Sequence, residues 1–442
     1  MTLSTKLALF PQTAEINGRG HLVVGGCDTV ELAAEFGTPL YVFDKNTLHS
    51  RCVEFLREFG QRYADVLVIY ACKAFINPTI AHLLEQEGLG LDVVSGGELH
   101  IAKSCSFPMS KVYFHGNNKS LEELRLALEW GVGRIVVDNI SELKLLESLV
   151  SQMGRVADIL IRVSPGIDAH THKYITTGLI DSKFGLPIVT GQAEEAVALA
   201  MNSANFNLHG LHFHVGSSVF ETAPYLKAMG VAFRFAAEMQ DKHCFQLQEL
   251  NCGGGFAVQY TVGDPAPPLS HYAEAITSTL LEQCQNLGMT APRLIIEPGR
   301  AIVAQAGVAL YTIGSSKDVK GIRRYIFVDG GMADNIRPAL YESTYELVVA
   351  NKANEPENDV VTVGGRYCES SDIIGKDVHL PVTKAGDIIA VPTSGAYSIP
   401  LASNYNAALR PAIVMVENGQ AHLIRRRETY DDLLSCEALG LN

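Results

Sequence analysis

The sequence predicts an α/β protein with a (β/α)8 barrel of the TIM type and a second, all-β domain that forms a β-barrel or sandwich. From about residue 47, short apolar runs alternate with amphipathic stretches. Eight such units fit within about 250 residues, which is typical of a closed (β/α)8 barrel. From about residue 303 the helical period fades and short β-type runs replace it. An open, doubly wound sheet is the alternative for the first part, although eight units in this length favour closure.

The first barrel strand is predicted at 66–74, V-L-V-I-Y-A-C-K-A, because its apolar run suits a strand that is buried on both faces. Asn77 and Pro78 then supply an N-cap and a first helical residue. Lys73 should therefore lie at the carboxyl end of a parallel strand, where α/β enzymes place their chemistry. The other predicted strands are 89–95, 111–116, 134–139, 157–165, 208–217, 247–255 and 293–300.

The predicted β domain contains short runs rich in β-branched residues, separated by Gly and Pro. Two strand-like runs near the N-terminus, 21–26 and 39–44, lie outside the count of eight, on either side of a helical stretch at 29–36. We expect them to join the C-terminal β domain. The predicted ranges are 1–46 for these strands, 47–302 for the barrel that binds the cofactor, and 303–442 for the C-terminal β domain; its runs are 308–313, 325–329, 359–363, 387–391 and 411–416.

Composition limits the partners that we expect. The 442 residues carry a net charge of −13, which argues against nucleic acid or an anionic membrane as the main partner. The nine cysteines are odd in number and include no C-x-x-C pair, which is typical of a reduced, cytoplasmic chain rather than a disulfide framework or a metal site. No apolar run approaches the ~18 residues of a membrane span.

Residues at the predicted strand ends suggest a cofactor. A lysine with a buried stem, such as Lys73, can form a Schiff base with a carbonyl. Glycines after the seventh strand, and Gly299 with Arg300 after the eighth, suit a phosphate, although turns need glycine anyway. Together they suggest pyridoxal phosphate. Glu297 would then face the ring nitrogen, the alternative being a salt bridge to Arg300. His214 could lie flat on the ring or be merely hydrogen-bonded.

At this point the sequence resembles the pyridoxal-phosphate-dependent decarboxylases of the alanine-racemase-like barrel fold, and among them most closely the diaminopimelate decarboxylases. The resemblance runs from about residue 25 to 435. It rests on Y-A-C-K-A (70–74), D-V-V-S-G-G-E (92–98), R-V-S-P-G-I-D-A-H-T-H-K-Y-I-T-T-G (162–178), S-K-F-G (182–185), H-F-H-V-G-S (212–217), G-G-G-F (253–256), E-P-G-R (297–300), C-E-S-S-D (368–372), G-A-Y (395–397), S-N-Y-N (403–406) and R-R-R-E-T-Y-D-D-L (425–433).

The resemblance implies a role for each matching residue. Lys73 would bind pyridoxal 5'-phosphate covalently, His214 would stack on its ring, and Glu297 would pair with the ring nitrogen. Cys368 would protonate the carbanion from the partner subunit, so that the active site of a homodimer would be shared between its subunits. The residues that would hold the phosphate are Ser217, Gly255, Gly299, Arg300 and Tyr397.

The resemblance also implies the substrate, meso-2,6-diaminopimelate, which would be decarboxylated to L-lysine and CO2 in the last step of lysine biosynthesis. Arg337 and Tyr341 match the family's pair for the distal carboxylate, and Arg300 and Tyr397 would also contact the substrate. Glu369 matches the residue that binds the distal amino group. Relatives that act on ornithine have a shorter acid there and lack the arginine.

Two alternatives stay open. One is another enzyme on the same scaffold, a decarboxylase for ornithine, arginine or carboxynorspermidine, or a racemase. The other is an inactive regulatory homologue that only binds partners, which should have lost Lys73, Glu297 or Cys368. Arg337 could also be a surface ion-pair residue. The chain departs from the family pattern at Ser218, at Leu401 and in G-G-R-Y (364–367), and these departures bear on the shape of the pocket.

Overall fold

The computed structural model describes residues 3–167 and 182–438, which form two compact units. The barrel unit comprises Cys52–Ala257 and Ala266–Arg300, and the β unit comprises Met1–Arg51, Val258–Pro265 and Ala301–Asn442. The sequence placed the boundaries after residues 46 and 302 and counted 258–265 with the barrel, whereas this segment packs with the β unit. Residues 168–178 of the motif at 162–178 lie outside the described ranges.

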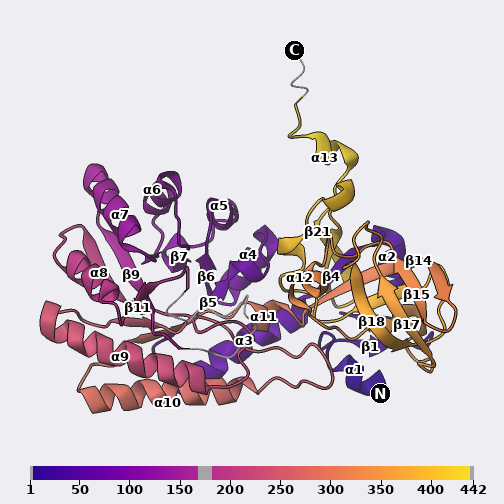
Figure 1. The fold of residues 1–442 in the computed structure, drawn as a ribbon, viewed down its shortest axis with the longest axis horizontal. Helices are drawn as coiled ribbons and strands as arrows, with labels where there is room; N and C mark the ends of the chain where they lie inside the picture. Colours follow the sequence, from indigo (N-terminus) through magenta and orange to yellow (C-terminus); the bar gives the residue numbers. More distant parts are fainter. Residues whose placement is uncertain (1–2, 168–181, 439–442) are drawn as a thin grey trace. The chain divides into compact units, whose positions relative to one another are not determined.

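The barrel unit confirms the predicted α/β fold class (Figure 1). Its parallel strands pair in the order β9-β11-β12-β13-β5-β6-β7-β8, and β8 pairs back onto β9, which closes the barrel. A short strand, β10 (Leu186–Pro187), also pairs with β9. The eight strands are β5 (Val66–Ala71), β6 (Gly90–Val93), β7 (Val112–Phe114), β8 (Arg134–Val137), β9 (Ala157–Ser164), β11 (Phe206–His212), β12 (Glu249–Asn251) and β13 (Arg293–Ile296).

The barrel interior is a packed apolar layer. Ile69, Tyr113, Val136, Leu160 and Ile295 come from five different strands and form one buried cluster. Burying these side chains removes apolar surface from water and fixes which face of each strand points inward. The polar residues that follow each strand are thereby placed at the carboxyl-end mouth.

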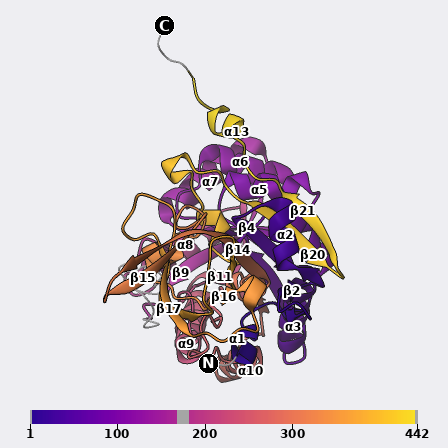
Figure 2. The same cartoon turned by 90° about the vertical axis from the view of Figure 1, so that its right-hand side faces the viewer.

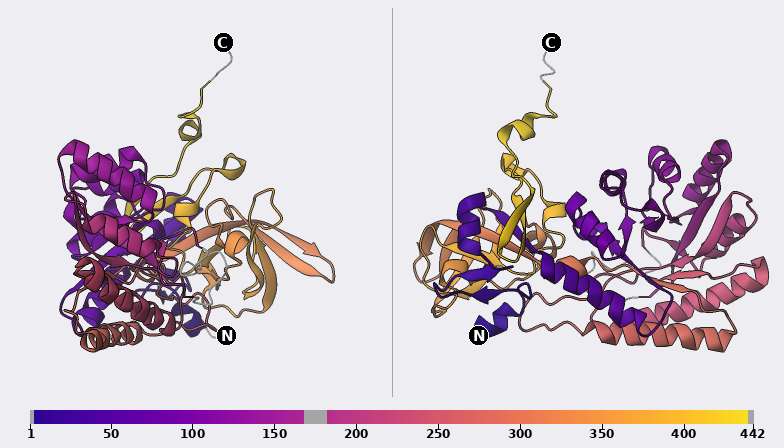
Figure 3. Two further views of the ribbon diagram at one scale, coloured as in Figure 1. Left: turned by 60° about the vertical axis from the view of Figure 1, so that its left-hand side comes forward. Right: turned by 180° about the vertical axis from the view of Figure 1, so that it is seen from behind.

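Helices follow most barrel strands, and local capping explains where they begin. Asn77 accepts a hydrogen bond from the Ile80 amide and Pro78 is the first helical residue, as the sequence predicted. Figures 1 and 3 show α9 and α10 lying side by side. The helices are α3 (Lys45–Gly60), α4 (Pro78–Gln86), α5 (Gly96–Ser104), α6 (Leu121–Trp130), α7 (Ile140–Met153), α8 (Gln192–Met201), α9 (Ala223–His243), α10 (Leu269–Leu287) and α11 (Arg300–Val303).

The β unit is built on a mixed sheet in the order β18-β17-β15-β14-β4-β20-β21, with β19 also pairing β14 and β16 pairing β19 (Figure 2). Strand β4 comes from the N-terminal segment and lies between β14 and β20, so the N-terminal and C-terminal strands share one sheet. The strands are β4 (Leu40–Asp44), β14 (Gly307–Val319), β15 (Arg323–Val328), β16 (Val348–Val349), β17 (Asp359–Gly364), β18 (Ile373–Leu380), β19 (Ile388–Val391), β20 (Ala412–Glu417) and β21 (Gln420–Arg425).

The rest of the β unit is small. Helix α2 (Thr29–Phe36) spans the helical stretch that the sequence predicted, and Asp28 caps it by accepting a hydrogen bond from the Val30 amide. A three-stranded antiparallel sheet precedes it, and three short helices complete the unit. The strands of this small sheet are β1 (Glu15–Ile16), β2 (Leu22–Val24) and β3 (Cys27–Asp28). The short helices are α1 (Leu3–Leu7), α12 (Arg337–Tyr341) and α13 (Tyr430–Leu434). No helix within the described ranges has both the length and the hydropathy to cross a bilayer.

Candidate active site

Lys73 lies just beyond the end of β5, in a single turn of 3-10 helix, Cys72–Ala74. Its side chain is 42% exposed, and Nζ lies 3.7 Å from Oδ2 of the buried Asp92, the third residue of β6. An amine that faces solvent at the mouth of a barrel and has a carboxylate beside it is accessible to a carbonyl reactant. The position therefore fits the predicted Schiff-base lysine, although its side chain is more exposed than the buried stem that the sequence suggested.

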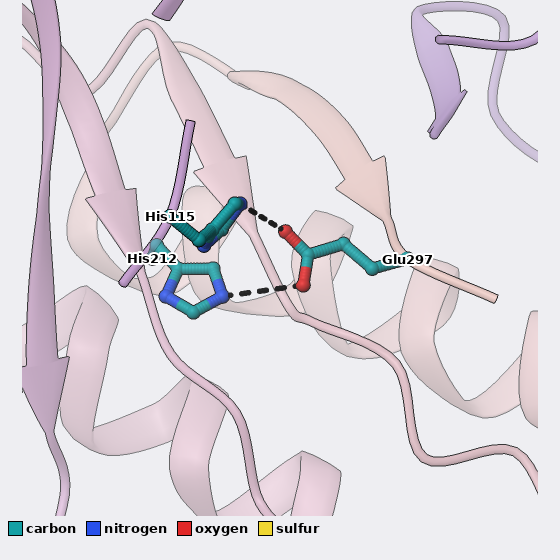
Figure 4. A group of neighbouring side chains, drawn as sticks. All are labelled: His115, His212 and Glu297. Atoms are coloured by element: carbon teal, nitrogen blue, oxygen red, sulfur yellow. Dashed lines mark hydrogen bonds and ion pairs between the residues drawn. The ribbon is translucent and has the colours of Figure 1, made fainter. Parts of the chain in front are cut away.

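Glu297 follows β13 and is buried beside side chains at the ends of three other barrel strands, of which Figure 4 shows His115 and His212. Its Oε1 accepts a hydrogen bond of 2.7 Å from Asn251 Nδ2 and lies 3.0 Å from His115 Nε2, while its Oε2 lies 3.4 Å from His212 Nε2. Burial alone would raise the pKa of this carboxyl, but the two histidines facing it hold the pKa well below its ordinary value. Glu297 is therefore a buried anion whose partners differ from the Arg300 alternative considered from the sequence.

His214, in the loop after β11, packs against the glycine turn that follows β12. The Gly254 amide donates to His214 Nδ1 at 3.2 Å. A Cβ on Gly254 would lie 2.2 Å from the Glu297 carbonyl oxygen. A Cβ on Gly255, where φ is +106°, would lie 2.4 Å from the Gly216 carbonyl oxygen. Only glycine fits this close approach of backbone segments. Burial, then the charges of Lys73 and Arg162, lowers the pKa of His214 well below its ordinary value, so the ring is neutral.

Arg300 begins α11, and its Nη2 donates to Ser217 Oγ at 3.2 Å. Gly299 packs against the end of β5, because a Cβ there would lie 3.0 Å from the Ala71 Cβ. A cation, a hydroxyl and a close-packed glycine thus converge beside the glycine turn. The barrel unit brings together seven of the predicted site residues: Lys73, His214, Ser217, Gly255, Glu297, Gly299 and Arg300.

Five predicted site residues belong to the β unit, and Arg337 is the most informative. Its guanidinium is buried, with the residue only 5% exposed, and lies over the ring of Tyr260, 4.5 Å from the ring centroid. It donates a hydrogen bond to the Tyr345 hydroxyl, while its Nε is buried without a hydrogen-bond partner among the described residues. The ion pairs described for residues 3–167 and 182–438 include none to Arg337. The alternative of a surface ion-pair residue is therefore wrong.

Tyr341 ends the same short helix, α12, and is half-buried. Tyr397 is also half-buried and has φ of +61°, an unusual backbone conformation for a side chain of this size. Such a conformation persists only where the surroundings impose it, and it is common at functional sites.

Cys368 and Glu369 lie on an exposed loop between β17 and β18. The Cys368 amide donates to Asn406 Oδ1 at 3.1 Å, and its carbonyl accepts from the Tyr405 hydroxyl at 3.2 Å. Asp372 anchors the other end of the loop by accepting from the Tyr367 amide at 2.8 Å. The loop therefore presents both exposed side chains on a backbone that is held at each end.

Comparison with known proteins identifies the family. The model of the pyridoxal-dependent decarboxylases, pyridoxal binding domain, matches residues 46–304. The diaminopimelate decarboxylase of Bacillus subtilis is 46% identical over 96% of this chain and 97% of its own length. The chain belongs to the diaminopimelate decarboxylase family. It is a pyridoxal-dependent decarboxylase, and its cofactor is pyridoxal phosphate.

Solved structures agree with this membership. Diaminopimelate decarboxylase from M. jannaschii, in a co-complex with L-lysine, has a TM-score of 0.91 at 35% identity and covers 97% of this chain and 98% of its own. The enzyme from Helicobacter pylori, also complexed with L-lysine, has a TM-score of 0.85 at 32% identity and covers 92% of this chain and 98% of its own. The (β/α)8 barrel and β domain are thus those of this family.

The residues of the barrel unit fit pyridoxal phosphate. The charged carboxylate of Glu297 suits a protonated ring nitrogen, and the exposed amine of Lys73 suits the aldehyde. Gly254 and Gly255, where a Cβ would collide with neighbouring backbone, leave a turn without side chains, and this turn together with the cation of Arg300 suits a phosphate.

Sequence reasoning missed several residues that shape the site. His115, Asn251 and Asp92 received no role: His115 lies near the end of the predicted strand 111–116, and the other two lie within the predicted strands 247–255 and 89–95. Their signal was a polar residue directly after an apolar run in H-G (115–116), N-C (251–252) and D-V-V (92–94). Tyr260 and Tyr345, which surround Arg337, lie in loops and carried no such signal.

Proposed function

We propose that this chain catalyses the pyridoxal-phosphate-dependent decarboxylation of meso-2,6-diaminopimelate to L-lysine and CO2, the last step of lysine biosynthesis. The family membership supports the reaction type, and the L-lysine bound to two structural relatives is the product of that reaction. The observation that carries the choice of substrate is the buried guanidinium of Arg337.

A buried cation needs a compensating anion, because the loss of hydration is costly. The aromatic faces of Tyr260 and Tyr345 stabilise the guanidinium of Arg337 only in part. A carboxylate presents two oxygens that match the planar fork of an arginine. The distal carboxylate of diaminopimelate would supply this anion, whereas ornithine and arginine have no second carboxylate.

The remaining roles follow from chemistry at named atoms. Pyridoxal phosphate, when bound, supplies an electron sink for the electrons that remain when CO2 leaves. Lys73 would bind the cofactor through Nζ, and Glu297 would hold a negative charge opposite the ring nitrogen. His214 would stack on the ring. The residues assigned to the phosphate are Ser217, Gly255, Gly299, Arg300 and Tyr397.

On the substrate side, Arg337 and Tyr341 would orient the distal carboxylate, with Arg300 and Tyr397 in contact with the substrate. The exposed carboxylate of Glu369 would bind the distal ammonium group. The thiol of Cys368 would deliver a proton to Cα after CO2 has left.

We further propose that the enzyme works as a cytoplasmic homodimer. Cys368 and Glu369 are exposed on a loop of the β unit whose backbone is held by Asn406 and Tyr405. An exposed, anchored pair of reactive side chains suits a site that is completed by a second copy of the chain. Nine cysteines without a C-x-x-C pair suit a reducing compartment.

Product analysis tests the proposal. The purified protein with pyridoxal phosphate and meso-diaminopimelate should release CO2 and L-lysine in equal amounts, measured by gas analysis and mass spectrometry. The matched control is the Lys73→Ala variant, which keeps the rest of the site. Absence of lysine from the wild-type reaction, with cofactor bound, would contradict the proposal.

A further inference from the structure

The carboxylate of Glu297 is surrounded by polar side chains from other barrel strands. Asn251 ends β12, His212 ends β11 and His115 follows β7. The four residues are between 0% and 4% exposed. Figure 4 shows both imidazoles directed at the two oxygens of Glu297, which come within 3.0 Å of His115 Nε2 and 3.4 Å of His212 Nε2.

We propose that His115 and His212 are positioning residues: together with Asn251, they hold the carboxylate of Glu297 in the charged state and orientation that meet the ring nitrogen of pyridoxal phosphate. This inference rests on the pairing of Glu297 with the ring nitrogen in the proposed function.

The physical need for such partners is clear. A carboxylate taken out of water gains a proton unless hydrogen bonds and opposite charge compensate the lost hydration. A protonated Glu297 could not hold the ring nitrogen in its charged form, which is the form that draws electrons from Cα. Asn251 supplies one hydrogen bond to Oε1 at 2.7 Å, and the histidines face the same carboxylate from the other strands.

His212 acts as a neutral donor. Burial lowers its pKa to about 3, so the imidazole is uncharged at neutral pH and presents Nε2–H to Glu297. Its Nδ1 is buried without a hydrogen-bond partner among the described residues. A neutral donor orients the carboxylate and leaves its negative charge available to the ring nitrogen, whereas a fixed cation would compete with the cofactor.

His115 lies between two carboxylates. Its Nε2 is 3.0 Å from Glu297 Oε1 and 3.7 Å from Asp92 Oδ1, and Asp92 Oδ2 is in turn 3.7 Å from Lys73 Nζ. The guanidinium of Arg162, from β9, adds positive charge to both acids. The titratable groups that interact with Glu297 are His115, His212, His214, Asp92, Arg162 and Cys252.

Glutamine and asparagine are a matched pair of replacements for histidine. Glutamine places its amide nitrogen near the position of histidine Nε2, and asparagine places it near Nδ1. His212→Gln should therefore keep the donor to Glu297, while His212→Asn should remove it with a similar change in polarity. Thermal unfolding of each variant shows whether it folds, and Asn251→Ala, which removes the 2.7 Å hydrogen bond to Oε1, serves if the His212 variants do not.

The test measures binding of the cofactor rather than turnover of the substrate. Full-length protein stripped of cofactor is dialysed against pyridoxal phosphate, and separately against the analogue whose ring nitrogen is replaced by C–H. His212→Asn should weaken binding of pyridoxal phosphate by about tenfold, the order expected for one hydrogen bond to a charged group. It should leave the affinity for the analogue unchanged, and His212→Gln should restore the wild-type value.

Each other outcome has a distinct meaning. Equal weakening for both ligands in the asparagine variant would show a merely structural role and overturn the inference. Loss of affinity in the glutamine variant as large as in the asparagine variant would also overturn it. If the wild-type protein itself bound both ligands equally, the pairing of Glu297 with the ring nitrogen would fail, and the inference with it. The proposed reaction would not fail with it, because lysine formation from diaminopimelate is measured in a separate experiment.

Discussion

Replacing Arg337 by glutamine should raise the KM for meso-diaminopimelate and leave kcat little changed. Arg337 is 5% exposed, and its guanidinium lies over the ring of Tyr260 and donates a hydrogen bond to the Tyr345 hydroxyl. Truncating one partner of a buried charge pair costs about 2–5 kcal/mol. At about 1.4 kcal/mol per factor of ten, kcat/KM should fall between about 30-fold and several thousand-fold.

The loss should appear in KM because the distal carboxylate is remote from the reacting carbon and binds equally in the ground and transition states. The assay is steady-state CO2 release over a range of substrate concentrations. Arg337→Lys keeps the charge but not the planar fork, so its KM should lie between the wild-type and glutamine values. Arg323, which forms an ion pair with Asp377 at 3.0 Å in the same unit, supplies the matched control. Arg323→Gln should leave KM unchanged. A wild-type KM in a folded Arg337→Gln variant would refute the assignment of the distal carboxylate.

Three further outcomes are expected. Lys73→Ala should abolish turnover of diaminopimelate, and full activity in that variant would contradict the role of Lys73 as the cofactor-binding lysine. If the site is shared across a two-fold dimer, mixing Lys73→Ala and Cys368→Ser chains should restore about a quarter of the wild-type sites. The reason is that only mixed dimers, about half of the total, hold one intact site of two. No recovery after subunit exchange would argue for sites within single chains. Burial raises the pKa of Asp334 to about 7 in the folded state, so its stabilising contribution is present at acid pH and is lost as pH rises from about 4 through 7. Asp334→Asn should therefore show a melting temperature that depends less on pH between 5 and 8, and an unchanged pH slope would contradict this.

The barrel could be predicted because its signal is local and repeated. Runs such as 66–74 are apolar on both faces, and each is followed by capping residues such as Asn77 that start the next helix. The strands proved shorter than expected, since β5 ends at Ala71 and β11 at His212. The polar residues beyond these points belong to the mouth and not to the sheet, and apolar periodicity cannot locate that change.

The β unit was harder to predict in detail. Strand β18 has largely exposed or half-buried residues and β21 has none that is buried, so neither shows the apolar run that marked β19 or β20. The small segment 258–265 packs with this unit although the chain before and after it belongs to the barrel. Only the three-dimensional packing shows that this segment joins the β unit.

The candidate site likewise contains residues that could be predicted from the sequence and residues that could not. Lys73 and Glu297 could be found because each directly follows a recognisable strand, and the resemblance to the family supplied their roles. The partners of Glu297 and the aromatic faces around Arg337 could not, because they are set by tertiary packing between residues far apart in sequence. His115 and Glu297, for example, are brought within 3.0 Å only when the barrel closes.

The most direct test of the account compares kcat/KM for meso-diaminopimelate, ornithine and arginine with the purified protein and pyridoxal phosphate. The account predicts efficient decarboxylation of diaminopimelate to L-lysine and little or no turnover of the other two, because only diaminopimelate brings a second carboxylate to Arg337. Preferential turnover of ornithine or arginine would leave the fold and the cofactor standing and would contradict the roles given to Arg337 and Glu369.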